Sequence, residues 1–258
     1  MCDTKDKLIE QASGVLEKTY EDVVHPSAKS IGNTLSLVPR TVGVWLGKWE
    51  KWVINGEESI KLTASAVQEK ASKIPEEKLT EPESYVAIPA IQQLSYCYDS
   101  EELREMYANL LVSSMNTDTK YQVHPSFVDI IKQLTPDEAK LLKKLSKKKV
   151  YPLIDVRMSL PTGGYNEIVH NFTDEGEDVC DCPSNIFAYL DNFERLKLID
   201  IKNGKYLTND EFYKPLENHP EIKKIMSESL PEGYKWQIEK GMFELTAFGR
   251  EFIKICLN

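Results

Sequence analysis

Residues 85–142 constrain the fold most, because their apolar side chains recur at the spacing of helices that bury one face. In the segment 100–115 the apolar positions share one helical face, at Leu103, Met106, Tyr107, Leu110 and Leu111. Ser100, followed by acidic residues, marks a capped helix start. The pattern predicts helices at 89–98 and 100–115, and a shorter helix that opens after His124-Pro125.

The segment that precedes them also has helical periodicity. Helices are predicted at 5–24, 27–52 and 57–73, with a loop near 74–84 that contains Pro75 and Pro82. The second of these helices combines three glycines with three tryptophans, at Trp45, Trp49 and Trp52. Such a segment suits a buried helix or one that contacts a membrane interface or a partner. Burial is the preferred interpretation, because no basic face opposes the apolar residues.

The C-terminal half has a different pattern. Thr135-Pro136 begins a helix, residues 150–160 are extended, residues 173–183 form an acidic loop, and a helix follows to residue 196. Hairpin turns are expected at Asn203-Gly204 and Lys240-Gly241, before a closing helix. We therefore predict a mainly α protein with a helical domain at residues 1–132 and a winged-helix-like α+β domain at residues 133–258.

Composition and charge narrow the functional classes. The formal net charge of −9 argues against a surface built to neutralise phosphates, so nucleic acid is not an expected partner. Charges at the N-terminus occupy the place of a signal peptide's apolar core, which indicates a cytoplasmic protein. The five cysteines are then expected to be thiols.

The sequence offers no motif for catalysis. It contains no Walker loop, dinucleotide glycine pattern, HExxH or GxSxG, so no catalytic residue is assigned and no cofactor is expected. The best metal candidate is the pair Cys180 and Cys182 in the acidic loop. A single intervening residue is poor spacing for zinc, which favours two to four, so a solvated loop is the preferred interpretation.

Three segments together carry a family resemblance. They are YVAIPAIQQLSYCYDSEELREMYANLLVSSMN, VHPSFVDIIKQLTPDEAKLL and the closing ELTAFGREFIKICL. Their order resembles the abortive-infection alpha (Abi-alpha) family of bacterial proteins. The resemblance implies a part in defence against bacteriophage, and it implies no reaction. Within the central motif, Asn109 and His124 are polar residues beside positions that packing alone explains, and they are the functional candidates.

The preferred function is a non-enzymatic abortive-infection effector or sensor that works through protein contact or self-association. Its leading mechanism is membrane contact by residues 28–52 after a trigger. Two other classes stay open: a nuclease or nucleotide-modifying effector, and a transcriptional regulator of a defence locus. A close to neutral recognition helix at 184–196 speaks against duplex binding.

Overall fold

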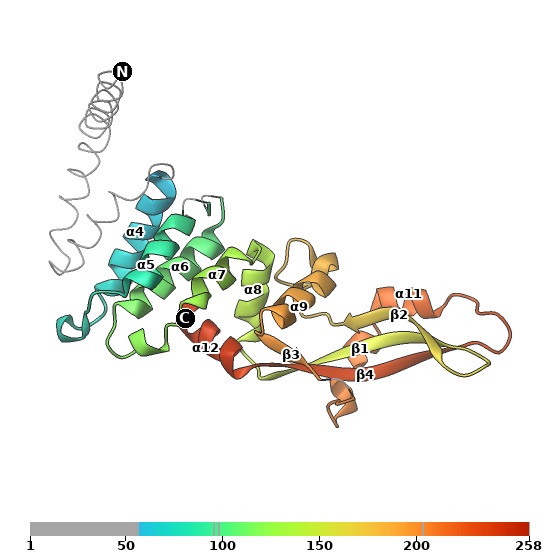
Figure 1. Cartoon of the computed structure of the whole chain (residues 1–258). Coiled ribbons are helices and arrows are strands. Elements are labelled where there is room, and N and C mark those ends of the chain that lie inside the picture. The colour runs from blue at the N-terminus through green and yellow to red at the C-terminus, as the bar shows by residue number, and fades with distance from the viewer. Residues whose placement is uncertain (1–56, 95, 98, 203, 258) are drawn as a thin grey trace, which may run out of the picture. The chain divides into compact units, whose positions relative to one another are not determined.

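The computed structural model describes residues 57–257 except residues 95, 98 and 203. The predicted helices at 5–24 and 27–52, with Trp45, Trp49 and Trp52, lie outside the described residues. The described chain forms two compact units (Figure 1). One holds the residues up to Asp99 with Tyr107–Val128, and the other holds Ser100–Met106 with the residues from Asp129 on. The boundary at residue 132 stays a prediction.

The N-terminal elements follow the apolar periodicity. They are α4 (Glu57–Ala71), a 3-10 turn at Glu76–Lys78, α5 (Ser84–Leu94), α6 (Glu101–Ser114), a 3-10 turn at Lys120–Gln122 and α7 (Ser126–Lys132). Leu110 and Leu111 are fully buried, as their spacing predicts. The buried Tyr107 hydroxyl donates to the Val128 carbonyl at 3.2 Å. Helix α5 begins five residues before the predicted start and holds Pro89 inside it.

The remaining elements combine helices with one sheet. They are α8 (Pro136–Leu145), β1 (Val150–Ser159), β2 (Tyr165–Phe172), α9 (Ile186–Arg195), β3 (Ile199–Ile201), α10 (Lys214–Glu217), α11 (Pro220–Met226), β4 (Lys235–Leu245) and α12 (Ala247–Cys256), with 3-10 turns at Pro183–Asn185 and Asp210–Phe212. The four strands pair in the antiparallel order β2-β1-β4-β3. The described fold is therefore α+β, and the mainly α prediction underweighted this sheet.

Helix α8 begins as its sequence predicts. The Thr135 hydroxyl accepts from the Glu138 N–H at 3.2 Å, and the Glu138 carboxylate accepts from the Thr135 N–H at 2.6 Å. This reciprocal capping box satisfies two backbone donors that the first helical turn leaves open. Pro136 occupies the first turn, where its missing N–H costs nothing.

The predicted turn at Lys240-Gly241 is wrong. Both residues lie inside the continuous strand β4, and Gly241 pairs directly with Leu153 of β1. A Cβ at Gly241 would overlap the Leu153 side chain, so glycine permits a close approach here and not a turn. Strand β3 pairs with the end of β4, with Ile199 opposite Leu245, and not with its immediate sequence neighbours.

The two faces of β1 differ in chemistry. Ile154 and Val156 point into an apolar cluster that Tyr213, Leu216 and Ile222 complete, so α10 and α11 cover this face. Strand β2 and both of these helices were not predicted from the sequence. In the described part of the chain, no helix is long and apolar enough to cross a bilayer.

Gly249 of α12 is where the helix approaches Leu198 most closely, and it carries a stability prediction. A Cβ there would overlap the Leu198 carbonyl, which is backbone and cannot rotate away. Gly249→Ala should lower the free energy of unfolding by about 3 kcal/mol or more, because overpacked sites that cannot relax are costly. Gly241→Ala is the matched control, since its Cβ would overlap the end of the flexible Leu153 side chain and would meet the Leu153 backbone only at an ordinary contact distance. Urea denaturation followed by circular dichroism measures both. Equal losses in the two variants would contradict this packing.

Candidate functional site

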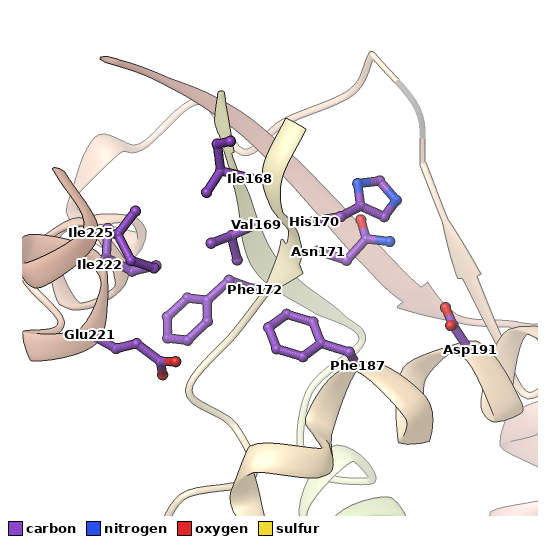
Figure 2. A pocket seen from close by; sticks show the side chains of 10 residues that line it. All are labelled: Ile168, Val169, His170, Asn171, Phe172, Phe187, Asp191, Glu221, Ile222 and Ile225. Carbon is purple, nitrogen blue, oxygen red and sulfur yellow. The ribbon is translucent and has the colours of Figure 1, made fainter. Parts of the chain in front are cut away.

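An open groove of about 450 Å³ lies beside strand β2, between α9 and α11 (Figure 2). Its lining is mostly apolar: Ile168, Val169 and Phe172 from β2, Phe187 from α9, and Ile222 and Ile225 from α11. In Figure 2 the rings of Phe172 and Phe187 lie side by side, with centroids 6.5 Å apart. Ile168 is 45% exposed and Phe187 is 37% exposed. The groove thus offers apolar surface to a ligand or partner.

Acidic residues stand at the rim of this groove. Asp191 of α9 and Glu221 of α11 both line it, and both are exposed. Neither carboxylate forms an ion pair with another residue that the structure describes. An occupant with a cationic group beside its apolar surface would therefore suit the groove electrostatically.

A β-bulge shapes the edge of the groove. Ile154 pairs with Phe172 and Val156 pairs with Val169, so His170 and Asn171 together oppose Asp155 alone. Asn171 has a φ of 55°, a left-handed conformation that asparagine tolerates better than most residues. The buried Asp155 carboxylate accepts from the Asn171 N–H at 2.8 Å and lies 3.1 Å from His170 Nδ1. Asp155 therefore fixes the bulge and, through it, the position of His170.

Arg157 joins the bulge to the polar face of the sheet. Its guanidinium lies 3.0 Å from Asp155, 3.5 Å from Glu167 and 3.4 Å from Glu239. It also stacks over the Tyr165 ring, with 4.3 Å between the guanidinium carbon and the ring centroid. The charges of Asp155 and Glu167 are thus balanced from within the sheet.

The bulge also gathers three ligand-type side chains. Within the described ranges, Asp155, Glu167 and His170 are the one group whose carboxylate and imidazole atoms all lie within 4.8 Å of one another. A cation there would have to compete with Arg157, which already pairs with both carboxylates. The geometry therefore fits an ion-paired bulge better than a metal centre.

The acidic loop that holds Cys180 and Cys182 is organised by one carboxylate. Asp137 of α8 accepts from the Asp181 N–H at 2.9 Å, the Cys182 N–H at 2.8 Å and the Tyr189 hydroxyl at 3.1 Å. Burial raises the pKa of the Cys180 thiol to about 11, which keeps it protonated and a poor metal ligand. Hydrogen bonding to Asp137 thus accounts for the loop, while Cys180 and Cys182 as ligands stay an untested, weak prediction.

The same loop pairs with a row of lysines on α8. Lys140 lies 2.7 Å from Asp181, and Lys144 lies 2.5 Å from Asp178 and 3.2 Å from Glu175. Much of the positive charge of this helix is therefore already neutralised within the protein.

The two candidates from the central motif lie in different settings. Asn109 is 5% exposed within α6. His124 is exposed at the start of α7, where its Nδ1 accepts from the Ser126 N–H at 3.2 Å and lies 2.6 Å from the Ser126 hydroxyl. This contact gives His124 a capping role. A functional role for either residue stays a prediction.

Sequence reasoning missed the groove, because two of the three elements that line it, β2 and α11, were not predicted. The available signal was the exposed apolar Ile168 within the polar segment YNEIVHNF. The apolar residues of this segment, at 165, 168, 169 and 172, do not alternate with the polar ones, so the period of a strand is missing from the sequence.

The Asp137 network generates a prediction about pH. Burial raises the pKa of Asp137, but hydrogen bonds from Asp181, Cys182 and Tyr189, with Lys140 nearby, outweigh burial and lower it below its ordinary value. A lowered pKa adds stability above the ordinary aspartate value and loses it as pH falls through the folded pKa. Asp137→Asn should cost about 2 to 3 kcal/mol at pH 7 and flatten the stability profile below about pH 4.

Unfolding midpoints across pH, in guanidinium chloride, measure this effect. The exposed Asp178→Asn is the control and should cost about 0.5 kcal/mol or less, because water screens its pair with Lys144. An Asp137→Asn variant as stable as Asp178→Asn, with an unchanged acid profile, would rule out the network as the loop's anchor.

Comparison with known proteins identifies the family of this chain. No curated protein matches the chain. A solved structure of an uncharacterized protein from the hydrocarbon-degrading marine bacterium Alcanivorax borkumensis SK2 is similar at 19% identity, with a TM-score of 0.35, over 55% of this chain and 96% of that one. The profile described as "Abortive infection alpha" matches residues 55–256, which is most of the sequence. The chain therefore belongs to the abortive infection alpha family.

Proposed function

We propose that this protein acts in abortive infection as a non-enzymatic effector or sensor, through contact of the β2 groove with an extended segment of a partner protein. Family membership implies the role in anti-phage defence. The contact mechanism is argued from the groove and the strand beside it.

The observation that carries the proposal is the edge strand β2. It is the outer member of the order β2-β1-β4-β3, and Tyr165–Ile168 are exposed. Proteins usually protect such an edge with lysine, proline, a β-bulge or a covering element. Tyr165–Phe172 contains no lysine or proline, and its pairing with β1 is regular over residues 165–167, before the register shifts. This regular part of the edge, beside an apolar groove, suits β-augmentation, in which a peptide strand adds backbone hydrogen bonds and places alternate side chains in pockets.

The groove also indicates the chemistry of the segment. Apolar side chains would cover Ile168 and Phe187, and a lysine or arginine would face the carboxylates of Asp191 and Glu221, which have no ion pair among the residues that the structure describes. Because apolar contact supplies most of the affinity and charge supplies orientation, both features belong to the expected occupant.

The winged-helix interpretation is supported by the order of elements. The strand order β1-β4-β3, with α9 before β3 and a long connection before β4, is compatible with such a domain that carries β2 as an extra edge. Arg195 on α9 is bound to Gln133 Oε1 at 2.9 Å and to Asn192, so it is held within the protein. Protein contact is therefore the preferred use of this domain over DNA readout.

Two further parts of the proposal rest on the sequence alone. Membrane contact by residues 28–52, with Trp45, Trp49 and Trp52, remains the proposed effector step after triggering. Contact with a partner protein or self-association remains the proposed trigger. Leakage of anionic vesicles caused by the full chain, compared with that caused by a Trp45→Ala and Trp49→Ala variant, tests the membrane contact.

Substitutions in the groove test the contact mechanism directly. Cells that express the wild type should survive a low phage dose and collapse early at a high dose. Ile168→Asp and Phe187→Asp should abolish both responses, because a buried unpaired charge weakens docking by more than about 1.4 kcal/mol, which is tenfold in affinity. Phe212→Asp is the control, since Phe212 is also an exposed apolar residue, at 52%, but lies outside the groove lining.

Thermal unfolding of each purified variant separates lost contact from lost fold. Full protection by stably folded Ile168→Asp and Phe187→Asp would contradict the groove as the contact site. His124→Asn belongs in the same challenge, because asparagine keeps a capping acceptor and removes the imidazole. Loss of protection in a folded His124→Asn variant would support a functional role for that residue, and so would the same result for Asn109→Ala.

A further inference from the structure

A second hollow, of about 430 Å³, lies where β4 ends and α12 begins. Eight residues line it: Ser146, Lys147, Lys148, Lys149, Leu245, Arg250, Ile253 and Lys254. Five of the eight are cationic and none is acidic, in a chain whose formal net charge is −9. Neither the β2 groove nor family membership explains why so many positive charges line this hollow.

The floor of the hollow is apolar and its rim is charged. Leu245 is 3% exposed and Ile253 is 4% exposed, so both belong to the core. Arg250 and Lys254 stand four residues apart on α12 and therefore share one helical face. Lys147, Lys148 and Lys149 are exposed on the segment that joins α8 to β1. The hollow therefore presents its cationic side chains to a ligand, while the core residues Leu245 and Ile253 beneath them offer little surface.

The backbone that carries the three lysines is fixed in place. The buried Tyr151 hydroxyl donates to the Leu145 carbonyl at 2.8 Å and accepts from the Lys148 N–H at 3.0 Å. The Leu245 N–H donates to the Lys149 carbonyl at 3.2 Å. Burial raises the pKa of Tyr151 to about 12, so the hydroxyl stays a donor throughout the physiological range. The Arg250 guanidinium in turn donates to the Leu245 carbonyl.

The cationic residues around the hollow differ in how far other residues of the protein balance their charge. Lys148 lies 3.9 Å from Glu175 and over the Tyr151 ring, so part of its charge is balanced. Lys149 and Arg250 face the hollow from opposite elements, and Arg250 presents a planar fork of N–H donors that matches a phosphate. Like charges that line one hollow repel one another, and a bound anion reduces that repulsion.

The geometry points to a binding site for a small multiply phosphorylated molecule, with its phosphates on the cationic rim of the hollow. The volume lies within the range of about 300–1,000 Å³ that is usual for small-molecule sites. Because several cations line the hollow, charge complementarity favours a ligand that carries several negative charges.

A small ligand fits the charge distribution better than a nucleic acid. A polynucleotide would extend beyond the hollow and meet the acidic surface of a chain with net charge −9, within a Debye length of about 8 Å. A compact polyphosphate stays within the basic patch and experiences mainly its local potential.

Isothermal titration of the purified full chain with ATP, inorganic triphosphate, AMP and a 20-nucleotide single-stranded RNA tests this site. ATP and triphosphate should bind more tightly than AMP, with affinity that falls as salt rises. The double substitution Lys149→Glu and Arg250→Glu should weaken ATP binding by at least about tenfold. Lys205→Glu, an exposed lysine outside the hollow, is the control and should change it less than about twofold.

Three results would overturn the assignment. They are no heat of binding with any probe at about 1 mM, ATP affinity unchanged by the double substitution, and RNA binding that is lost in the double variant while ATP and triphosphate do not bind. The milder Lys149→Gln and Arg250→Gln pair, checked by thermal unfolding, should show the same direction of change if charge reversal disturbs the fold.

Discussion

The pairing of β1 with β4 is the constraint on which the C-terminal unit depends. The two strands run antiparallel from Val150 opposite Glu244 to Ser159 opposite Lys235. Because a strand alternates its side chains between two faces, this register sends Ile154 and Val156 to the apolar core and Asp155 and Arg157 to the polar face. A slip by one residue would exchange the two sets.

The two candidate sites follow from this register at different points. Beside the middle of β1, Asp155 holds the bulge of β2 and so sets the edge of the apolar groove. At the other end, the contact between Lys149 and Leu245 brings the lysine segment beside α12. One strand pair thus places an apolar acidic-rimmed groove and a cationic hollow in the same unit. Because the chemistries are opposite, the groove suits a protein segment and the hollow suits a separate, phosphorylated ligand.

The sequence predicted the features that arise locally. The Thr135 cap and α8 depend on residues within one turn, and the helices α4 and α6 depend on apolar spacing along one segment. The errors came from distant contacts. Gly241 has the composition signal of a turn, but its reason is the Leu153 side chain across the sheet. Strand β2 is too polar to be recognised without its partner β1, and without β2 neither the bulge at Asp155 nor the groove could be predicted. The basic run at Lys147–Lys149 was visible, but Arg250 and Lys254 join it only through the fold.

The most direct test of the contact mechanism is hydrogen–deuterium exchange of β2 in the full chain, isolated from cells before and after phage infection. The account predicts slower exchange in the peptide that covers residues 165–172 after infection, because a docked strand would pair the open edge, and unchanged exchange in the central part of β4. Unchanged exchange of residues 165–172 in protein from cells that have already stopped growing would contradict it.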